Sequence, residues 1–366
     1  MKKRSTPSKA NPFFSALREQ RHRFDPAEII ALFKRVDAER VRALAHELST
    51  YIGVNLPAAF EKRNALSDYR TNPYVLMTSA SVMSLDDPAK FGAFLFNSKL
   101  YMALETSFGK SIEAAFVGGY PLVGKSKWVE PPEKIAEFRR LEGLNREERA
   151  KRRVDSVWRE IDRSCVVGET RYVTSIKSGP NTINDTQVQG MTRAIIDNYE
   201  RWRDETFKTY PTVHNLDVVL GLTYGTDCTT NNKENQVLVK LLEYGFVEEN
   251  RAARPGVLRD RATGSVRVYR RIGKEFWAFI GQPDRPETAA FVFLEVLLAL
   301  SKALATGIRD ADLETRINLR LQQLAGTLAN IQFPRKSLPE WVRGDFSERE
   351  LFWFATAMTA FFDEGI

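Results

Sequence analysis

One stretch, residues 162–184, constrains the fold of this chain more than any other. The tripeptide Gly168-Glu169-Thr170 is a tight-turn signal, and apolar residues flank it on both sides: Val166, Val167, Tyr172, Val173 and Ile176. This pattern predicts a β-hairpin. Pairing the strands about that turn places Asp162 opposite Ser175, and Ser175 and Lys177 then share a face because strand side chains alternate. A loop rich in Gly, Pro and Asn follows. An acid and a lysine beside such a loop suit a site for a divalent metal and a phosphate.

Composition limits the class of protein. The 366 residues suffice for one large domain or two ordinary ones. The formal charge of +7 is compatible with a polyanionic partner, but it is equally ordinary for a basic enzyme. Two cysteines and three histidines predict neither a zinc cluster nor a disulfide framework, and they favour a reducing compartment. No apolar segment follows the basic N-terminus, so we expect no secretory signal. The apolar run 289–300 is broken by Glu295 and too short for a bilayer.

The order of predicted elements gives an α/β protein with a central mixed sheet flanked by helices. We expect a basic arm over residues 1–25, a helical region over 26–103, a core over 104–285 and a helical region over 286–366, packed together as one large domain. Within the core, periodicity predicts further elements after the hairpin. They are a helix over 183–208, a buried strand over 215–224, a polar loop over 225–235, a helix over 237–242 and a second hairpin over 257–271 that turns at Thr263-Gly264.

A phosphate-loop pattern occurs before the hairpin. Residues 119–126 match G-x-x-x-x-G-K-[ST] letter for letter. A true phosphate loop leaves a buried strand and opens a helix. Here the preceding residues favour a helix, and Pro121 lies inside the loop. A connecting loop is the favoured interpretation, and nucleotide binding through Gly119–Ser126 stays an alternative.

Several separated segments resemble the PD-(D/E)XK nuclease superfamily, and more closely its type II restriction endonucleases. Asp162 stands where that family has its first acid, and Ser175-Ile176-Lys177 stands at its (D/E)-X-K motif. Four segments are similar to other family segments: SIKSGPNTIND from Ser175, TSFGKSIE from Thr106, GLTYG from Gly221 and GKEFWAFIG from Gly273. They span roughly half of the chain, from Leu104 to Gly281. The resemblance implies a restriction-endonuclease-like core for this region.

This sequence departs from the family pattern at two positions. Ile161 replaces the proline before the first acid, and Ser175 occupies the position of the second acid. Serine cannot replace a carboxylate as a metal ligand, and some enzymes of the superfamily with a serine there recruit an acid from a neighbouring helix. By the same resemblance, the main-chain carbonyl of Ile176 is an additional metal ligand. The candidates for the relocated acid are Glu113 first, Asp185 second and Glu200 third.

The remaining candidates are weaker. Asp155 is a rival for Asp162 as the first acid if the strand register differs, and we expect His214 to be structural rather than a general base. Polar side chains after Lys177 either contact DNA phosphates or shape the loop and cap the next helix. They are Ser178, Asn181, Asn184 and Gln187.

The resemblance implies Mg²⁺-dependent cleavage of double-stranded DNA at a short specific sequence, leaving 5′-phosphate and 3′-hydroxyl ends. It further implies a homodimer acting on a two-fold symmetric site, a cognate DNA methyltransferase and a prokaryotic cytoplasm. Three alternatives remain open. They are a repair or structure-selective nuclease on the same fold, a nucleotide-binding protein using Gly119–Ser126, and a DNA-binding module in which Ser175 marks a decayed site.

Overall fold

A computed structural model describes residues 26–61, 66–69, 73–111, 127–154, 156–177, 185–225, 233–249, 256–310, 313–331 and 335–361. Contacts divide the chain into two compact units. The first comprises residues 1–44 and 113–298, and the second comprises residues 45–112 and 299–366. The first unit contains the sheet, and the second is built from helices. The predicted boundaries at 103 and 285 stay predictions.

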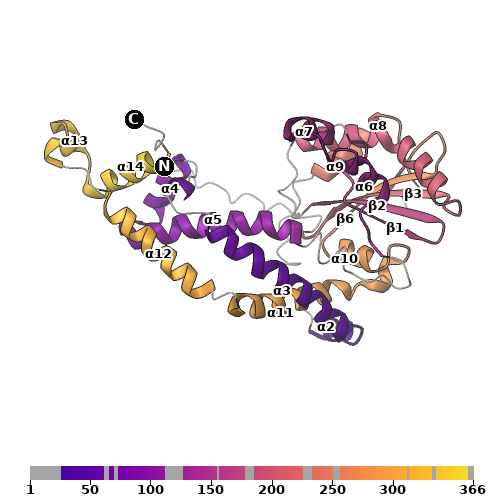
Figure 1. The fold of residues 1–366 in the computed structure, drawn as a ribbon, viewed down its shortest axis with the longest axis horizontal. Helices are drawn as coiled ribbons and strands as arrows, with labels where there is room; N and C mark the ends of the chain where they lie inside the picture. The colour runs from indigo at the N-terminus through magenta and orange to yellow at the C-terminus, as the bar shows by residue number, and fades with distance from the viewer. Residues whose placement is uncertain are drawn as a thin grey trace, which may run out of the picture. The chain divides into compact units, whose positions relative to one another are not determined.

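The first unit is organised around a six-stranded mixed sheet in the order β1-β2-β3-β6-β5-β4 (Figure 1). Strands β2, β3 and β6 run parallel to one another, and β1, β5 and β4 each pair antiparallel with a neighbour. The predicted mixed sheet is therefore confirmed. The strands are β1 (Arg163–Val167), β2 (Thr170–Lys177), β3 (Asn215–Leu222), β4 (Val247–Glu248), β5 (Leu258–Arg259) and β6 (Val266–Ile272).

The hairpin predicted from the turn signal forms β1 and β2. Val167 pairs with Thr170, and Gly168 between them has a φ of 59°. That left-handed conformation is one that glycine adopts without steric cost. The second predicted hairpin is also present, because β5 pairs antiparallel with β6 across a turn in which Gly264 has a φ of 69°.

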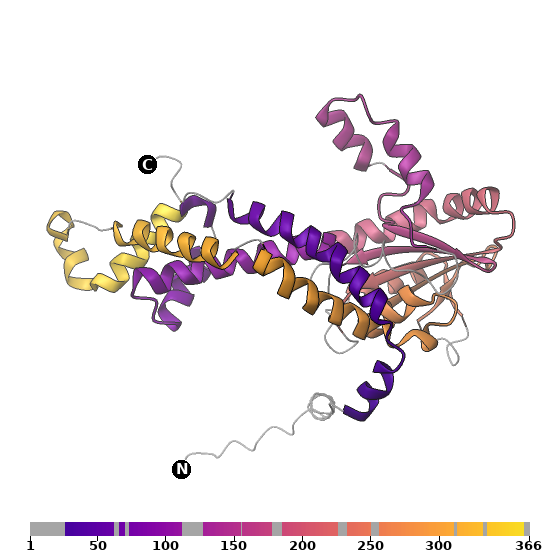
Figure 2. The ribbon, with the colours of Figure 1, turned by 60° about the horizontal axis from the view of Figure 1, so that its bottom comes forward.

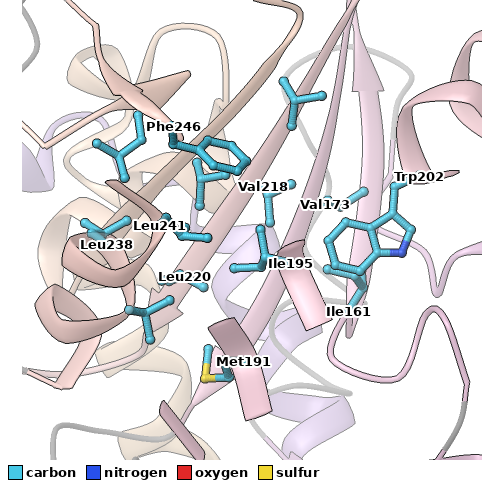
Figure 3. Packing of buried hydrophobic residues seen from close by; sticks show 14 of the residues in the cluster. Ile161, Val173, Met191, Ile195, Trp202, Val218, Leu220, Leu238, Leu241 and Phe246 are labelled. Carbon is cyan, nitrogen blue, oxygen red and sulfur yellow. The ribbon is translucent and has the colours of Figure 1, made fainter. Parts of the chain in front are cut away.

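Helices α8 (Asp185–Thr209) and α9 (Lys233–Glu243) cover one face of the sheet, and α10 (Lys274–Gly281) packs on the other (Figure 1). The core under α8 and α9 follows from strand alternation, because Leu216, Val218 and Leu220 of β3 all face these helices. Figure 3 shows Val173, Ile195 and Trp202 in the same cluster as Val218 and Leu220. Helix α9 begins at Lys233, inside the predicted loop 225–235, and the short strand β4 was not predicted.

On the α10 face of the sheet, segments 221–225 and 273–281 pack so closely that only glycine fits at two positions. A Cβ on Gly221 would lie 2.4 Å from the Phe276 ring, and one on Gly273 would lie 2.3 Å from the carbonyl oxygen of Gly225. The indole of Trp277 also donates a hydrogen bond to the carbonyl of Thr223 at 2.8 Å. Segments 221–225 and 273–281, which sequence similarity singled out separately, are therefore in direct contact.

The rest of the first unit consists of peripheral helices. Those wholly inside it are α2 (Pro26–Phe33), α6 (Pro132–Arg139), α7 (Arg146–Val154) and η4 (Pro286–Ala289); α3 (Ala38–Glu61) and α11 (Val292–Asp310) each contribute their first turns. The side chain of Glu295 is fully buried, and its carboxylate lies 3.0 Å from Arg40. The charge that interrupts the apolar run 289–300 is thus neutralised inside the fold. Asp37 lies between α2 and α3 and caps the start of α3, because its carboxylate accepts a hydrogen bond from the amide of Glu39.

The second unit also contains η1 (Leu66–Tyr69), α4 (Pro73–Val82), α5 (Pro88–Ser111), α12 (Leu313–Ala329), η5 (Arg335–Ser337), α13 (Glu340–Asp345) and α14 (Glu348–Phe361). Helix α12 lies alongside α5, and α14 packs on α4 and η1 (Figure 2). Helix α14 lies within the predicted helical region 286–366, and its Trp353 indole donates to the carbonyl of Leu85 at 2.7 Å. In the described parts of the chain, every helix is too short or too polar to cross a membrane.

Candidate active site

The hairpin positions Asp162 against the last residues of β2. Register pairs Arg163 with Thr174, so Asp162 lies opposite Ser175, as the sequence predicts. The backbone amide of Asp162 donates to the carbonyl of Thr174 at 2.8 Å. In return, its carboxylate accepts a hydrogen bond of 2.6 Å from the amide of Ile176. Because both bonds come from the β2 backbone, the carboxylate of Asp162 is held at a fixed place beside Ile176.

Lys177 ends β2 on the same face as Ser175, because the two positions alternate around Ile176. Its Nζ lies 3.9 Å from Oε2 of Glu160, and these side chains are 24% and 22% exposed. The pair is therefore loose and partly open to solvent. The carboxyl ends of the three parallel strands meet at this edge, with Lys177, Leu222 and Ile272 in lateral register. Ligands commonly bind at this edge of α/β sheets.

Glu160 is the site residue that sequence reasoning missed. It lies two positions before Asp162, at the end of a turn over residues 157–160. A sequence signal was available, since Glu160 and Asp162 form an acid-x-acid pair immediately before the first strand. Which partner Glu160 meets depends on how the turn packs against β2, and this cannot be read from spacing.

Ser175 lies opposite Asp162 and two residues before Lys177 on β2, and its environment is unusual. The residue is 2% exposed, and its Oγ has no hydrogen-bond partner among the described residues. The neighbouring hydroxyl of Thr174, which is also buried, donates to the carbonyl of Val219 at 3.1 Å. Buried polar groups are normally hydrogen-bonded. The hydroxyl of Ser175 is therefore a buried polar group that the described part of the chain leaves unsatisfied.

The oxygen donors at this edge fit a hard divalent cation. Among the described residues, no group of three His, Cys, Asp or Glu side chains gathers to hold a metal. Mg²⁺, however, is usually held by one or two carboxylates, with waters and substrate phosphates completing its octahedron. Asp162 and Glu160 can supply those carboxylates.

The other predicted residues lie in several places. The imidazole of His214 is exposed next to the start of β3, and the His214 amide donates to the carbonyl of Glu169, at the opposite end of β2 from Lys177. Glu200 is exposed on α8 and accepts a hydrogen bond of 3.0 Å from the hydroxyl of Tyr199. Gln187 is exposed on the first turns of α8. Asp185 begins α8, but its side chain lies outside the described part of the structure. Also outside the described residues are Glu113, Asp155, Ser178, Asn181, Asn184 and the phosphate-loop pattern Gly119–Ser126.

A second polar cluster lies on the α10 face of the same sheet. Asp217, in register with Arg267, accepts a hydrogen bond of 2.7 Å from that guanidinium and one of 2.9 Å from the hydroxyl of Tyr269. Burial raises the pKa of Asp217, and Arg267 opposes this shift. Burial also raises the pKa of Tyr172 to about 12. These residues line a cavity of about 680 Å³. Because the polar atoms of Asp217 are all partnered within the protein, this cluster has the character of a structural network.

A mixed sheet with helices on both faces, and a hairpin holding an acid and a lysine at the edge where the parallel strands end, define a restriction-endonuclease-like α/β core. The comparison with protein families agrees, since residues 145–295 match the family model of the type II restriction endonuclease EcoO109I. Residues 145–295 are therefore similar to that family of type II restriction endonucleases, and the hairpin within them is consistent with the PD-(D/E)XK superfamily. The match covers less than half of the chain but includes all six strands. No curated protein matches the sequence significantly.

Proposed function

We propose that this protein is a type II restriction endonuclease that cleaves double-stranded DNA at a short specific sequence in a Mg²⁺-dependent reaction. The observation that carries the proposal is the hairpin inside the matched segment, which holds Asp162 and Lys177 at one sheet edge. The similarity of residues 145–295 to the family supports a nuclease with a DNA substrate. The metal, the site specificity and the chemistry of the ends are our proposal.

In this proposal, Asp162 and the main-chain carbonyl of Ile176 hold Mg²⁺, and Ser175 stands at the position of the missing acid. When bound, the metal ion neutralises the scissile phosphate and lowers the pKa of a coordinated water. The amine of Lys177 orients the attacking water and stabilises negative charge on the phosphate. The oxygen of the attacking water bonds to phosphorus as the bond from phosphorus to the 3′ oxygen breaks. The proton of the attacking water passes to solvent, which leaves a 5′-phosphate, and the 3′ oxygen takes a proton from water to give the 3′-hydroxyl. Glu113 and Asp185 stay the sequence-based candidates for the second carboxylate.

The partners follow from the substrate. Four polar residues after Lys177 are proposed to contact DNA phosphates: Ser178, Asn181, Asn184 and Gln187. A homodimer would cut one strand per active site, and its two-fold axis would match a palindromic or near-palindromic sequence. Cleavage at a fixed sequence requires a cognate DNA methyltransferase to protect the host genome. The cysteine content agrees with a reducing prokaryotic cytoplasm.

The test is incubation of unmethylated phage DNA with the protein and Mg²⁺, with Asp162→Ala and Lys177→Ala as inactive controls. Discrete fragments with fixed ends from the unmodified protein alone support the proposal. Cutting that follows DNA structure, such as flaps or junctions, would instead identify a repair or structure-selective nuclease. Absence of cutting with every divalent metal tested would overturn the proposal.

A further inference from the structure

We propose that Glu160 is the second acid of this site, replacing the carboxylate that Ser175 lacks. The inference rests on the proposed nuclease function and adds a residue to it. Its starting point is the ion pair at the end of β2, where Oε2 of Glu160 lies 3.9 Å from Nζ of Lys177. The carboxylate of Glu160 therefore lies beside the proposed catalytic lysine, on a segment that leads directly into Asp162.

The turn that carries Glu160 is fixed on both sides. Trp158 and Ile161 are 2% and 1% exposed. The indole of Trp158 donates to Glu205 of α8 at 2.9 Å, and the carbonyl of Ile161 accepts a hydrogen bond of 2.7 Å from Lys134. The backbone around Glu160 is therefore anchored, while its side chain remains partly exposed. A preorganised backbone with an accessible carboxylate is what a metal ligand requires.

The charges around Glu160 leave its carboxylate available. Oε1 lies 3.6 Å from Nε of Arg159, and Oε2 lies 3.9 Å from Lys177. Both separations exceed hydrogen-bond length. Elsewhere in the first unit, a structural carboxylate is bound more closely, as Glu133 is by Arg171 at 2.7 Å. The carboxylate of Glu160 thus lies near Arg159 and Lys177 without a direct hydrogen bond to either side chain.

The hydroxyl of Ser175 gives an independent indication that this site takes a further ligand. Its Oγ is buried without a partner, on the same face of β2 as Lys177 and opposite Asp162. A water of the cation's hydration shell would satisfy this hydroxyl. With a serine here, the site keeps a small polar neighbour for that water, and the negative charge comes from Glu160.

The experiment measures binding of Mn²⁺ alone to the full-length protein, by isothermal titration calorimetry and by the electron paramagnetic resonance signal of free Mn²⁺. Glu160→Gln is compared with the unmodified protein, with Asp162→Asn and with Glu169→Gln. Glu169 lies exposed on the β1–β2 turn at the far end of the same hairpin, so its substitution removes an equal charge away from the site. Phage DNA cleavage with Mg²⁺ is the second readout, and thermal unfolding verifies that each variant is folded.

We expect Glu160→Gln to weaken Mn²⁺ binding about tenfold or more and to slow cleavage about 100-fold, while Glu169→Gln matches the unmodified protein. Equal Mn²⁺ affinity and cleavage in Glu160→Gln and Glu169→Gln would overturn the inference and leave the proposed function intact. If Glu113→Gln loses Mn²⁺ affinity and Glu160→Gln retains it, the relocated acid is Glu113 and the inference is wrong. If the unmodified protein cuts no DNA, the proposed function fails, and the Mn²⁺ titrations still decide whether Glu160 is a ligand.

Discussion

The two ends of strand β2 carry positive side chains on the same face, yet the protein treats them differently. Arg171 is completely buried, and its guanidinium donates to both carboxylate oxygens of Glu133 at 2.9 and 2.7 Å. It also donates to the hydroxyl of Thr206 at 3.0 Å, and its guanidinium carbon lies 5.1 Å from the Trp158 ring centroid. Lys177, six residues along, is 24% exposed and has Glu160 at 3.9 Å.

The difference separates a structural ion pair from a site. At Arg171, bidentate geometry and burial leave no room for another charged group. At Lys177, the pair is long, partly exposed and on the same face of β2 as the unpartnered hydroxyl of Ser175, so in our proposal a phosphate and a cation can enter without breaking strong bonds. Two ion pairs on one strand thus have opposite roles, which substitutions should reveal as opposite effects on stability and activity.

The largest effect on stability is expected at the end of β2 that carries the buried Arg171. Arg171→Met should lower the free energy of unfolding by about 3–5 kcal/mol, because it leaves the carboxylate of Glu133 without its buried partner. Lys177→Met should change it by less than about 1 kcal/mol, because that pair is partly exposed. Urea unfolding followed by tryptophan fluorescence measures both. Equal losses in the two variants would contradict the distinction between the two ends.

The next largest effect is expected on catalysis, at the end of β2 that carries Lys177. Lys177→Met should reduce the cleavage rate about 100- to 1,000-fold, because in the proposed mechanism it removes the group that stabilises charge on the phosphate. Single-turnover cleavage of a DNA fragment containing the recognition sequence measures this rate. The matched variant Lys208→Met, on an exposed residue of α8, removes the same charge and should cut normally. A Lys177→Met enzyme with full activity would remove the lysine from the mechanism.

Sequence reasoning succeeded where the signal was local. The turn at Gly168, the pairing of Asp162 opposite Ser175 and the shared face of Ser175 and Lys177 all follow from residues within one hairpin. It could not foresee that Glu133 would bind Arg171, since those residues are far apart in sequence and only packing of α6 brings them together. Glu160 was missed for a related reason, since the buried Trp158 and Ile161 decide where its turn lies.

The carboxylate of Asp260 is held by neutral hydrogen-bond donors rather than by a cation, and its contribution to stability should depend on pH. Burial alone would raise the pKa of Asp260, but hydrogen bonds from Thr263, Val266 and Gly264 outweigh it and hold that pKa below its ordinary value of 3.8. A depressed pKa adds stability above the unfolded-state pKa that is lost as pH falls through the folded-state value. Asp260→Asn should therefore cost about 1.5–3 kcal/mol at pH 7 and less near pH 3, measured by urea unfolding at both. An equal cost at the two pH values would show that the charge is irrelevant.

The smallest effect distinguishes the two neighbouring hydroxyls of β2. Ser175→Ala removes a buried hydroxyl that has no partner, so the free energy of unfolding should stay constant or rise by up to about 1 kcal/mol. Thr174→Val removes one that donates to Val219, and it should lower the free energy by about 1 kcal/mol. Chemical denaturation in a metal-free buffer measures both. A clear loss in Ser175→Ala would mean that water already satisfies this hydroxyl without a metal. The Lys177 end of β2 would then have no unsatisfied polar group waiting for a ligand, and the contrast with the Arg171 end would be smaller than the contacts around Lys177 indicate.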